Sequence, residues 1–152
     1  EYALIFLILL LLFYPIRKVS NLNLLKFRRS IGLLSFWYAV FHFLTYVILD
    51  QQLIWELIIQ DILKRPYIIV GFLGLLALIP LALTSNRWSI RSKGFAYRKK
   101  LHLMVYLAAL LGASHYLLLV KSWPIKPLLY FLCVLILILF RFGLIKLFKK
   151  IE

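Results

Sequence analysis

The sequence predicts an all-α, polytopic transmembrane helical bundle, and three observations carry this prediction. Hydrophobic residues make up 64% of the 152 residues and the mean hydropathy is +0.97, whereas soluble domains are roughly 45–50% apolar. Apolar runs recur, and all but the first approach the ~20 residues that a helix needs to cross a bilayer. These five runs are 2–14, 30–49, 66–86, 101–120 and 122–140. None alternates as barrel strands do, so helices must satisfy the backbone in lipid.

The first run differs from the other four because it holds only 13 residues before Pro15. Proline removes a hydrogen bond inside a helix, so we expect this run to be the remaining end of a longer spanning helix with further residues upstream. Basic residues follow the run instead of preceding it, which argues against a secretory signal peptide. With no repeat, low-complexity tract or linker, residues 1–152 are expected to form a single transmembrane domain.

The net charge of +14 reflects membrane orientation. Because successive loops alternate sides, 15 of the 19 Lys and Arg residues fall on one side and four on the other. By the positive-inside rule the basic side is cytoplasmic, which predicts a periplasmic N-terminus and a cytoplasmic C-terminus. Clusters of this kind contact anionic lipid, and they give no support to a nucleic-acid partner.

Two loops carry further expectations. Apolar residues at helical spacing in 50–66 predict a short amphipathic helix on the outer membrane surface, with Asp50, Glu56 and Asp61 solvated. The basic loop 85–100 is expected to contact lipid or a cytosolic partner. Cys133 is the only cysteine, so no intrachain disulfide can form.

His42 and His115 are ionisable groups inside apolar runs, where such groups are costly and usually functional. Counting from the flanking basic residues at ~1.5 Å per residue puts them about 20 and 22 Å along their helices. One full span separates the two helices, so they run in the same direction and the imidazoles should lie at similar depth. Two imidazoles at one level are what bis-histidine ligation of haem b requires.

Small residues share a helix face with each histidine. The residues at steps of three or four are Gly32, Ser35, Ala39 and Tyr46 around His42, and Ala108 and Gly112 before His115. They leave room for a flat ring, although small residues also form ordinary membrane helix interfaces. Together with the depth match they favour a haem cleft. Gly71 and Gly74, on the run between, are assigned to helix packing.

His102 is an open case at the cytoplasmic interface, level with Arg28 and Arg29. It is either an interfacial polar residue or the single ligand of a second, inner haem ~20 Å from His115 along the helix. A spacing of 13 residues turns the two side chains to different faces, and the chain has no fourth histidine to oppose it. Arg28 or Arg29 could pair with the propionates of such a haem. The sequence therefore predicts one or two haems.

Other chemistries find little support in the sequence. There is no H-E-x-x-H, Walker loop, G-x-G-x-x-G or nucleophile elbow. The main alternative is a histidine-dependent metal or proton transporter that uses His42 and His115, although no carboxylate or thiolate stands beside them. A third hypothesis is an assembly or scaffold protein whose histidines are incidental.

Four ordered blocks carry a family resemblance. They are RRSIGLLSFWYAVFHFLTY at 28–46, RPYIIVGF at 65–72, IPLALTS at 79–85 and LHLMVYLAALLGASHYLLLVK at 101–121. In these blocks the chain resembles the MsrQ (YedZ) family of ferric-reductase-like transmembrane proteins, and all three histidines fall where that family has them. One departure is that family members tend to carry Trp shortly before the Leu-His pair, where this chain has AYRKKLH.

The resemblance implies a function that residue chemistry alone does not. It implies a subunit of about six spans in the bacterial inner membrane, with haem b and FMN as cofactors. Such a subunit takes electrons from the quinone pool or a cytosolic flavin reductase. It passes them to a periplasmic molybdopterin enzyme, MsrP, which reduces methionine sulfoxide in oxidised proteins. Substrate catalysis would lie in that partner, so the predicted site residues are the cofactor-binding His42, His115, His102, Arg28 and Arg29.

Overall fold

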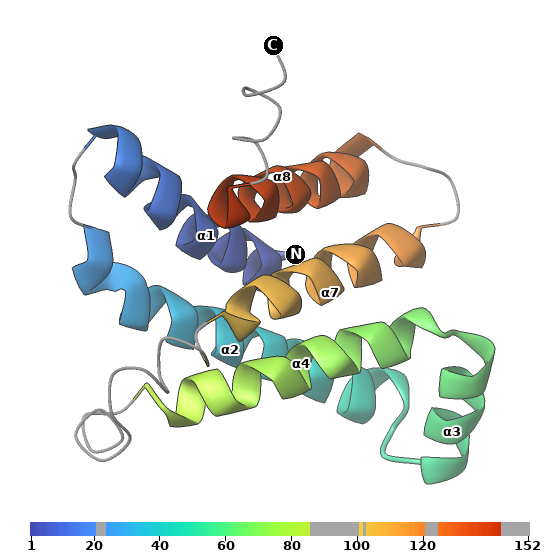
Figure 1. Ribbon diagram of the computed structural model, residues 1–152. Helices are drawn as coiled ribbons and strands as arrows, with labels where there is room; N and C mark the ends of the chain where they lie inside the picture. Colours follow the sequence, from blue (N-terminus) through green and yellow to red (C-terminus); the bar gives the residue numbers. More distant parts are fainter. Residues whose placement is uncertain (21–23, 86–100, 102, 121–124, 144–152) are drawn as a thin grey trace.

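The computed structural model describes residues 1–20, 24–85, 101, 103–120 and 125–143, and every regular element in these ranges is helical (Figure 1). The elements are α1 (Tyr2–Ser20), η1 (Leu24–Phe27), α2 (Arg28–Thr45), the π-helical turn η2 (Tyr46–Asp50), α3 (Trp55–Lys64), α4 (Tyr67–Leu83), α7 (Met104–Leu119) and α8 (Ile125–Phe142). The predicted all-α class is confirmed, and each of the five apolar runs contains a helix.

Three helices are long and apolar enough to cross a bilayer: α1 with 19 residues, α2 continued by η2 with 23, and α8 with 18. Helices α3 and α4 pass the same criterion only as a pair, and they meet at an angle of 107°. Helix α7 is apolar but has 16 described residues. By length and composition the described chain therefore offers three to four spans.

Helix α1 corrects one expectation. It continues through Pro15 to Ser20 instead of ending before the proline, and it is long enough to span. A proline is tolerated in a membrane helix when neighbouring helices and local adjustments compensate for the lost hydrogen bond. The last turn of α1 is supported in this way, since the Ser20 hydroxyl donates to the Ile16 carbonyl at 2.8 Å.

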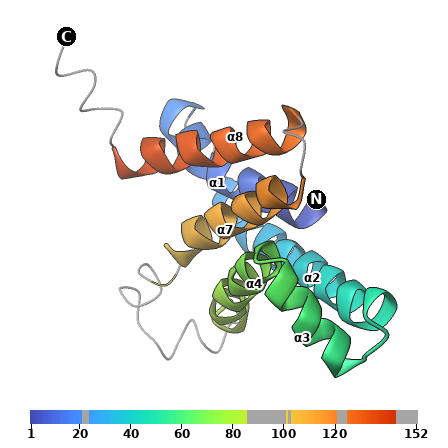
Figure 2. The same cartoon turned by 90° about the vertical axis from the view of Figure 1, so that its right-hand side faces the viewer.

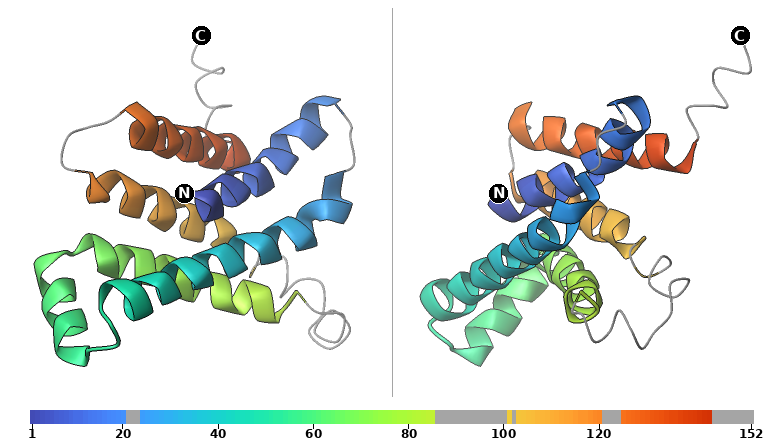
Figure 3. Two further views of the ribbon diagram at one scale, coloured as in Figure 1. Left: turned by 180° about the vertical axis from the view of Figure 1, so that it is seen from behind. Right: turned by 90° about the vertical axis from the view of Figure 1, so that its left-hand side faces the viewer.

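Helix α7 is the centre of the bundle, with α4 on one side and α8 on the other (Figures 1 and 2). Its Ala108, Ala109 and Ala113 are at most 1% exposed, which allows neighbouring backbones to approach closely. Helix α1 contacts α2 on one flank and α8 on the other (Figure 3). The core is therefore built on α1, α4, α7 and α8, and α2 forms an edge.

Large apolar side chains cover the outside of the bundle, as expected of a surface that faces lipid. Trp37 and Phe41 on α2 are 52% and 60% exposed. Helix α3 turns away from α4 and exposes Trp55 and Leu63, while Ile58 packs inwards (Figure 2). The short amphipathic helix predicted in 50–66 is confirmed as a helix.

Candidate haem site

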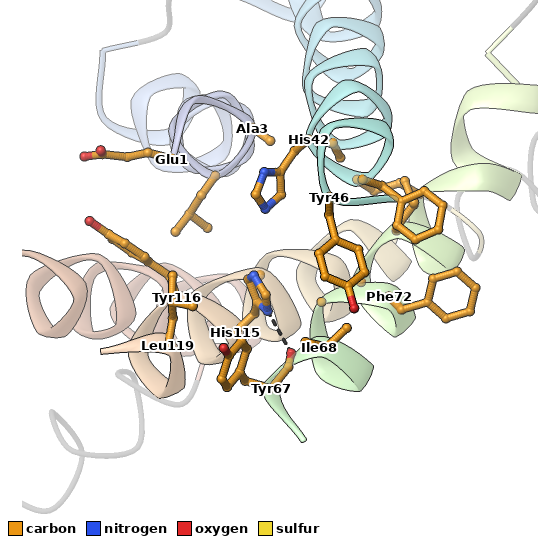
Figure 4. A pocket seen from close by; sticks show the side chains of 18 of the residues that line it. Glu1, Ala3, His42, Tyr46, Tyr67, Ile68, Phe72, His115, Tyr116 and Leu119 are labelled. Atoms are coloured by element: carbon orange, nitrogen blue, oxygen red, sulfur yellow. Dashed lines mark hydrogen bonds between the residues drawn. The ribbon is translucent and has the colours of Figure 1, made fainter. Parts of the chain in front are cut away.

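His42 from α2 and His115 from α7 point towards one another across the interior (Figure 4). Their ring centroids are 6.3 Å apart and their planes are inclined at 67°. The prediction that the two imidazoles lie at one level is therefore confirmed. Their role as ligands stays a prediction.

The two rings face a cavity of about 610 Å³ between α1, α2, α4 and α7. This volume is typical of a small-molecule or cofactor site. Small residues from all four helices create the space, namely Ala3, Ala39, Gly71, Gly74, Ala108 and Gly112. Leucines and aromatic residues form most of the remaining wall, so the site suits a large, flat and mainly apolar group.

His115 is held in one orientation by the first turn of α4. Its Nδ1 lies 2.7 Å from the main-chain carbonyl oxygen of Tyr67 (Figure 4). A carbonyl only accepts, so this contact requires the proton on Nδ1 and leaves Nε2 as the acceptor. A histidine ligand is typically oriented by such a bond from its other ring nitrogen. His115 is therefore prepared to coordinate a metal through Nε2.

Gly71 provides the space for the His115 ring. A Cβ at this position would lie 2.6 Å from Nδ1 and 2.9 Å from Cε1 of His115, closer than real Cβ atoms approach. The sequence assigned Gly71 to helix packing, and the partner in that packing proves to be the imidazole itself. Gly74 fits the original interpretation, because its Cβ would meet Leu111 Cβ at 3.4 Å across the α4–α7 contact.

His42 is held less firmly. Within the described part of the chain no hydrogen bond reaches its ring, and its side chain is exposed. Its helix is anchored lower down, where the buried Ser35 hydroxyl donates to the Ala3 carbonyl of α1 at 2.9 Å. The predicted stripe of small residues thus divides in two. Ser35 and Gly32 pack on α1, whereas Ala39 and Tyr46 line the cavity.

One end of the cavity is polar and is organised by Asp61. The Tyr46 hydroxyl and the Gln51 amide donate to Asp61 Oδ2 at 3.2 and 3.3 Å. Arg65 Nε lies 3.1 Å from Asp61 Oδ1. The expectation that Asp61 is a solvated loop residue is wrong, because it lies on α3 and its side chain is only 14% exposed. The bend between α3 and α4 turns this carboxylate inwards.

Arg28 and Arg29 lie at the first turn of α2, at the opposite end of that helix from His42. Neither lines the cavity. His102 lies outside the described residues. The inner haem that would bring these three residues together stays a prediction.

The geometry of the histidine pair fits a haem. Two metal–imidazole bonds of about 2 Å, with about 1.1 Å more from each nitrogen to its ring centre, would separate the two centroids by about 6 Å. The observed 6.3 Å matches this separation. In contrast, no three His, Cys, Asp or Glu side chains among the described residues form a group able to hold a metal ion by themselves. The donor set thus suits a metal that brings its own macrocycle.

Comparison with known proteins agrees with this geometry. Residues 1–113 match the family described as the ferric reductase like transmembrane component. The chain belongs to the ferric-reductase-like transmembrane family. It is therefore a multi-pass, all-helical membrane protein, and the matched region contains α1, α2, α4 and His42.

Individual relatives extend the match. The chain is 50% identical over 142 residues to proteins of Brucella ovis and Brucella canis, and 49% identical to one of Brucella melitensis. Each of these relatives is named "Protein-methionine-sulfoxide reductase heme-binding subunit MsrQ". The aligned region covers 93% of this chain and 64% of each relative. The resemblance to the MsrQ family is confirmed. No solved structure matches the chain.

Sequence reasoning missed three features of this site: the Tyr67 carbonyl, the space at Gly71 and the Asp61–Arg65 pair. A main-chain acceptor leaves no signal in residue type. The block RPYIIVGF contained Arg65, Tyr67 and Gly71. Its position at the entry to the helix beside His115 was the available clue.

Proposed function

We propose that the protein is a haem b-binding electron-transfer subunit of a protein-methionine-sulfoxide reductase system. The observation that carries the proposal is the pair of imidazoles 6.3 Å apart across a cavity walled by small and apolar residues. The name shared by the relatives, which span more than this chain, supports the same function. A bound haem b would supply one-electron transfer within the membrane.

The residues of the chain bind and orient that haem. His42 and His115 are the axial ligands, and the Tyr67 carbonyl and Gly71 fix the ring of His115. The remaining wall excludes water, which is one of the ways by which a protein sets a haem potential. No residue of the chain is proposed to act on the sulfoxide.

The proposed electron path leads from the cytoplasmic side to the periplasm of a bacterial inner membrane. The donor is the quinone pool or a cytosolic flavin reductase, and the acceptor is the periplasmic molybdopterin subunit MsrP. The 15 basic residues on one side support this orientation, with the first residue periplasmic and the C-terminal end cytoplasmic. A second haem at His102 with Arg28 or Arg29, and an FMN, remain predictions of the family resemblance.

The alternative of a histidine-dependent metal or proton transporter has less support. Two imidazoles alone would give a bare metal ion an incomplete ligand set, and the described residues offer no third ligand. Zinc at one equivalent per chain, with no haem, would favour that alternative.

The test is haem content per chain, measured by pyridine haemochrome and by dithionite-reduced spectra. We expect His42→Ala and His115→Ala each to lose most of the haem that His42 and His115 bind. Phe41→Ala is the matched control, because Phe41 neighbours His42 but is 60% exposed towards lipid and does not line the cavity. A wild-type protein without haem b, or a double histidine variant that keeps all of it, would overturn the proposal.

A further inference from the structure

The charged residues that line the cavity gather at its polar end. They are Glu1, Asp50, Asp61 and Arg65, and all lie near the ends of helices. The opposite end is lined by leucines such as Leu7 and Leu78. A ligand with one apolar and one polar edge therefore has a defined orientation in this cavity.

Arg65 is the one lysine or arginine that lines the cavity within the described part of the chain. Its Nε is engaged by Asp61 Oδ1 at 3.1 Å. A guanidinium has five N–H donors, so the terminal nitrogens retain donors for a second carboxylate. The neighbouring Tyr67 phenol, and after it Asp61, raise the pKa of Arg65 further, so the side chain stays charged at any physiological pH.

The Asp61 carboxylate limits the movement of Arg65. Its other oxygen accepts from Tyr46 at the end of α2 and from Gln51 just beyond. Both residues also line the cavity. The carboxylate is mostly buried, whereas the Arg65 side chain is 57% exposed, so Asp61 is the fixed partner and Arg65 the adaptable one.

We infer that Arg65 binds a propionate of the haem held by His42 and His115, and that Asp61 is the residue that positions Arg65. This inference rests on the proposed function. Haem b carries two carboxylates on one edge of an otherwise apolar ring, which matches the single polar end of the cavity. Arginine suits this role because its planar fork pairs with a carboxylate through two hydrogen bonds.

The competing interpretation is that Arg65 and Asp61 form an ordinary ion pair that only stabilises the bend between α3 and α4. An exposed pair of this kind contributes little to stability. The two interpretations differ in one respect that can be measured. Only a propionate contact makes the effect of Arg65 depend on free carboxylates on the haem.

The experiment combines two changes, one in the protein and one in the cofactor. Full-length protein produced without haem is loaded in detergent with haem b or with its dimethyl ester, whose carboxylates are blocked. The protein variants are Arg65→Gln and the control Lys64→Gln. Lys64 is the adjacent residue and loses the same charge, but it does not line the cavity. The haem population that His42→Ala loses is followed by its affinity and midpoint potential.

With haem b, Arg65→Gln is expected to weaken binding three- to tenfold, as the loss of a charge-assisted hydrogen bond does. The ratio of reduced to oxidised haem at fixed potential should fall by a similar factor, and tenfold is about 59 mV for one electron. Loss of a positive charge disfavours the reduced form. With the dimethyl ester, Arg65→Gln should match the parent protein, and Lys64→Gln should match it with both haems.

Two results would overturn the inference. In the first, Arg65→Gln and Lys64→Gln behave alike with haem b. In the second, Arg65→Gln has the same effect with both forms of haem, which indicates a purely structural role. Either can occur while the wild type binds haem normally through both histidines, and the proposed function then stands. Failure of the wild type to bind haem would instead remove the proposed function itself.

Discussion

His115 and His42 face the same cavity, but the protein holds them very differently. His115 lies on the central helix α7, and it is fixed by the Tyr67 carbonyl at 2.7 Å and enclosed by Gly71. His42 lies on α2 at the edge of the bundle, and no described residue hydrogen-bonds to its ring. One ligand is thus preorganised by its surroundings, and the other is positioned mainly by its helix.

This difference follows from where each helix packs. Helix α7 is surrounded by other helices and its small residues allow α4 to come close, so a carbonyl of α4 can reach the imidazole. Helix α2 has lipid on much of its surface. A preorganised ligand costs less conformational entropy on binding, whereas a freer ligand can adapt to the ring that arrives. We therefore expect variants around the two histidines to have unequal effects.

The largest effect is expected when each imidazole is removed and then replaced from solution. His115→Gly and His42→Gly should each reduce haem affinity by more than tenfold, since loss of a residue that merely orients a ligand already costs 10–100-fold. Added imidazole should restore His42→Gly better, because that side of the cavity is more open. The measurement is the reduced haem spectrum as a function of imidazole concentration. Equal rescue of the two variants would contradict the proposed difference.

The next effect isolates the fixing of His115. Gly71→Ala would place a methyl group 2.6 Å from Nδ1, so the ring must leave the Tyr67 carbonyl or α4 must move. We expect haem affinity to fall by roughly 10–100-fold and the low-spin electron paramagnetic resonance signal to change.

Gly74→Ala is the matched control for this variant. It adds the same methyl group to the same helix and the same cavity, but it meets Leu111 Cβ at 3.4 Å and no histidine. We expect a smaller loss of haem and an unchanged resonance signal. If both variants lose haem equally, then the close approach of α4 to α7 matters and the orientation of His115 does not.

The sequence predicted the features that depend on residue type and period. Apolar length predicted the helices, and counting at 1.5 Å per residue predicted that His42 and His115 share a level. It could not predict the features that depend on how helices pack. Whether Gly71 faces a backbone or an imidazole is decided by the rotation of α4 against α7, and periodicity alone does not fix that rotation. Asp61 was missed for the same reason, because the bend before Pro66 turns α3 back towards the cavity.

The smallest effect concerns the anchoring of α2, on which His42 depends. Ser35→Ala removes the hydrogen bond to the Ala3 carbonyl, which joins α1 and α2 in a fully buried position. A buried hydrogen bond of this kind contributes about 1 kcal/mol, so thermal unfolding in detergent should occur a few degrees lower.

Thr45→Ala is the control for that comparison, because the Thr45 hydroxyl bonds only to the Phe41 carbonyl of its own helix at 2.8 Å. A local bond of this type competes with the helix and adds little, so its loss should leave the unfolding temperature nearly unchanged. If His42 is positioned through α2, then Ser35→Ala should also weaken haem binding slightly while Thr45→Ala does not. Equal behaviour of the two variants would mean that the haem, and not the contact with α1, sets the position of His42.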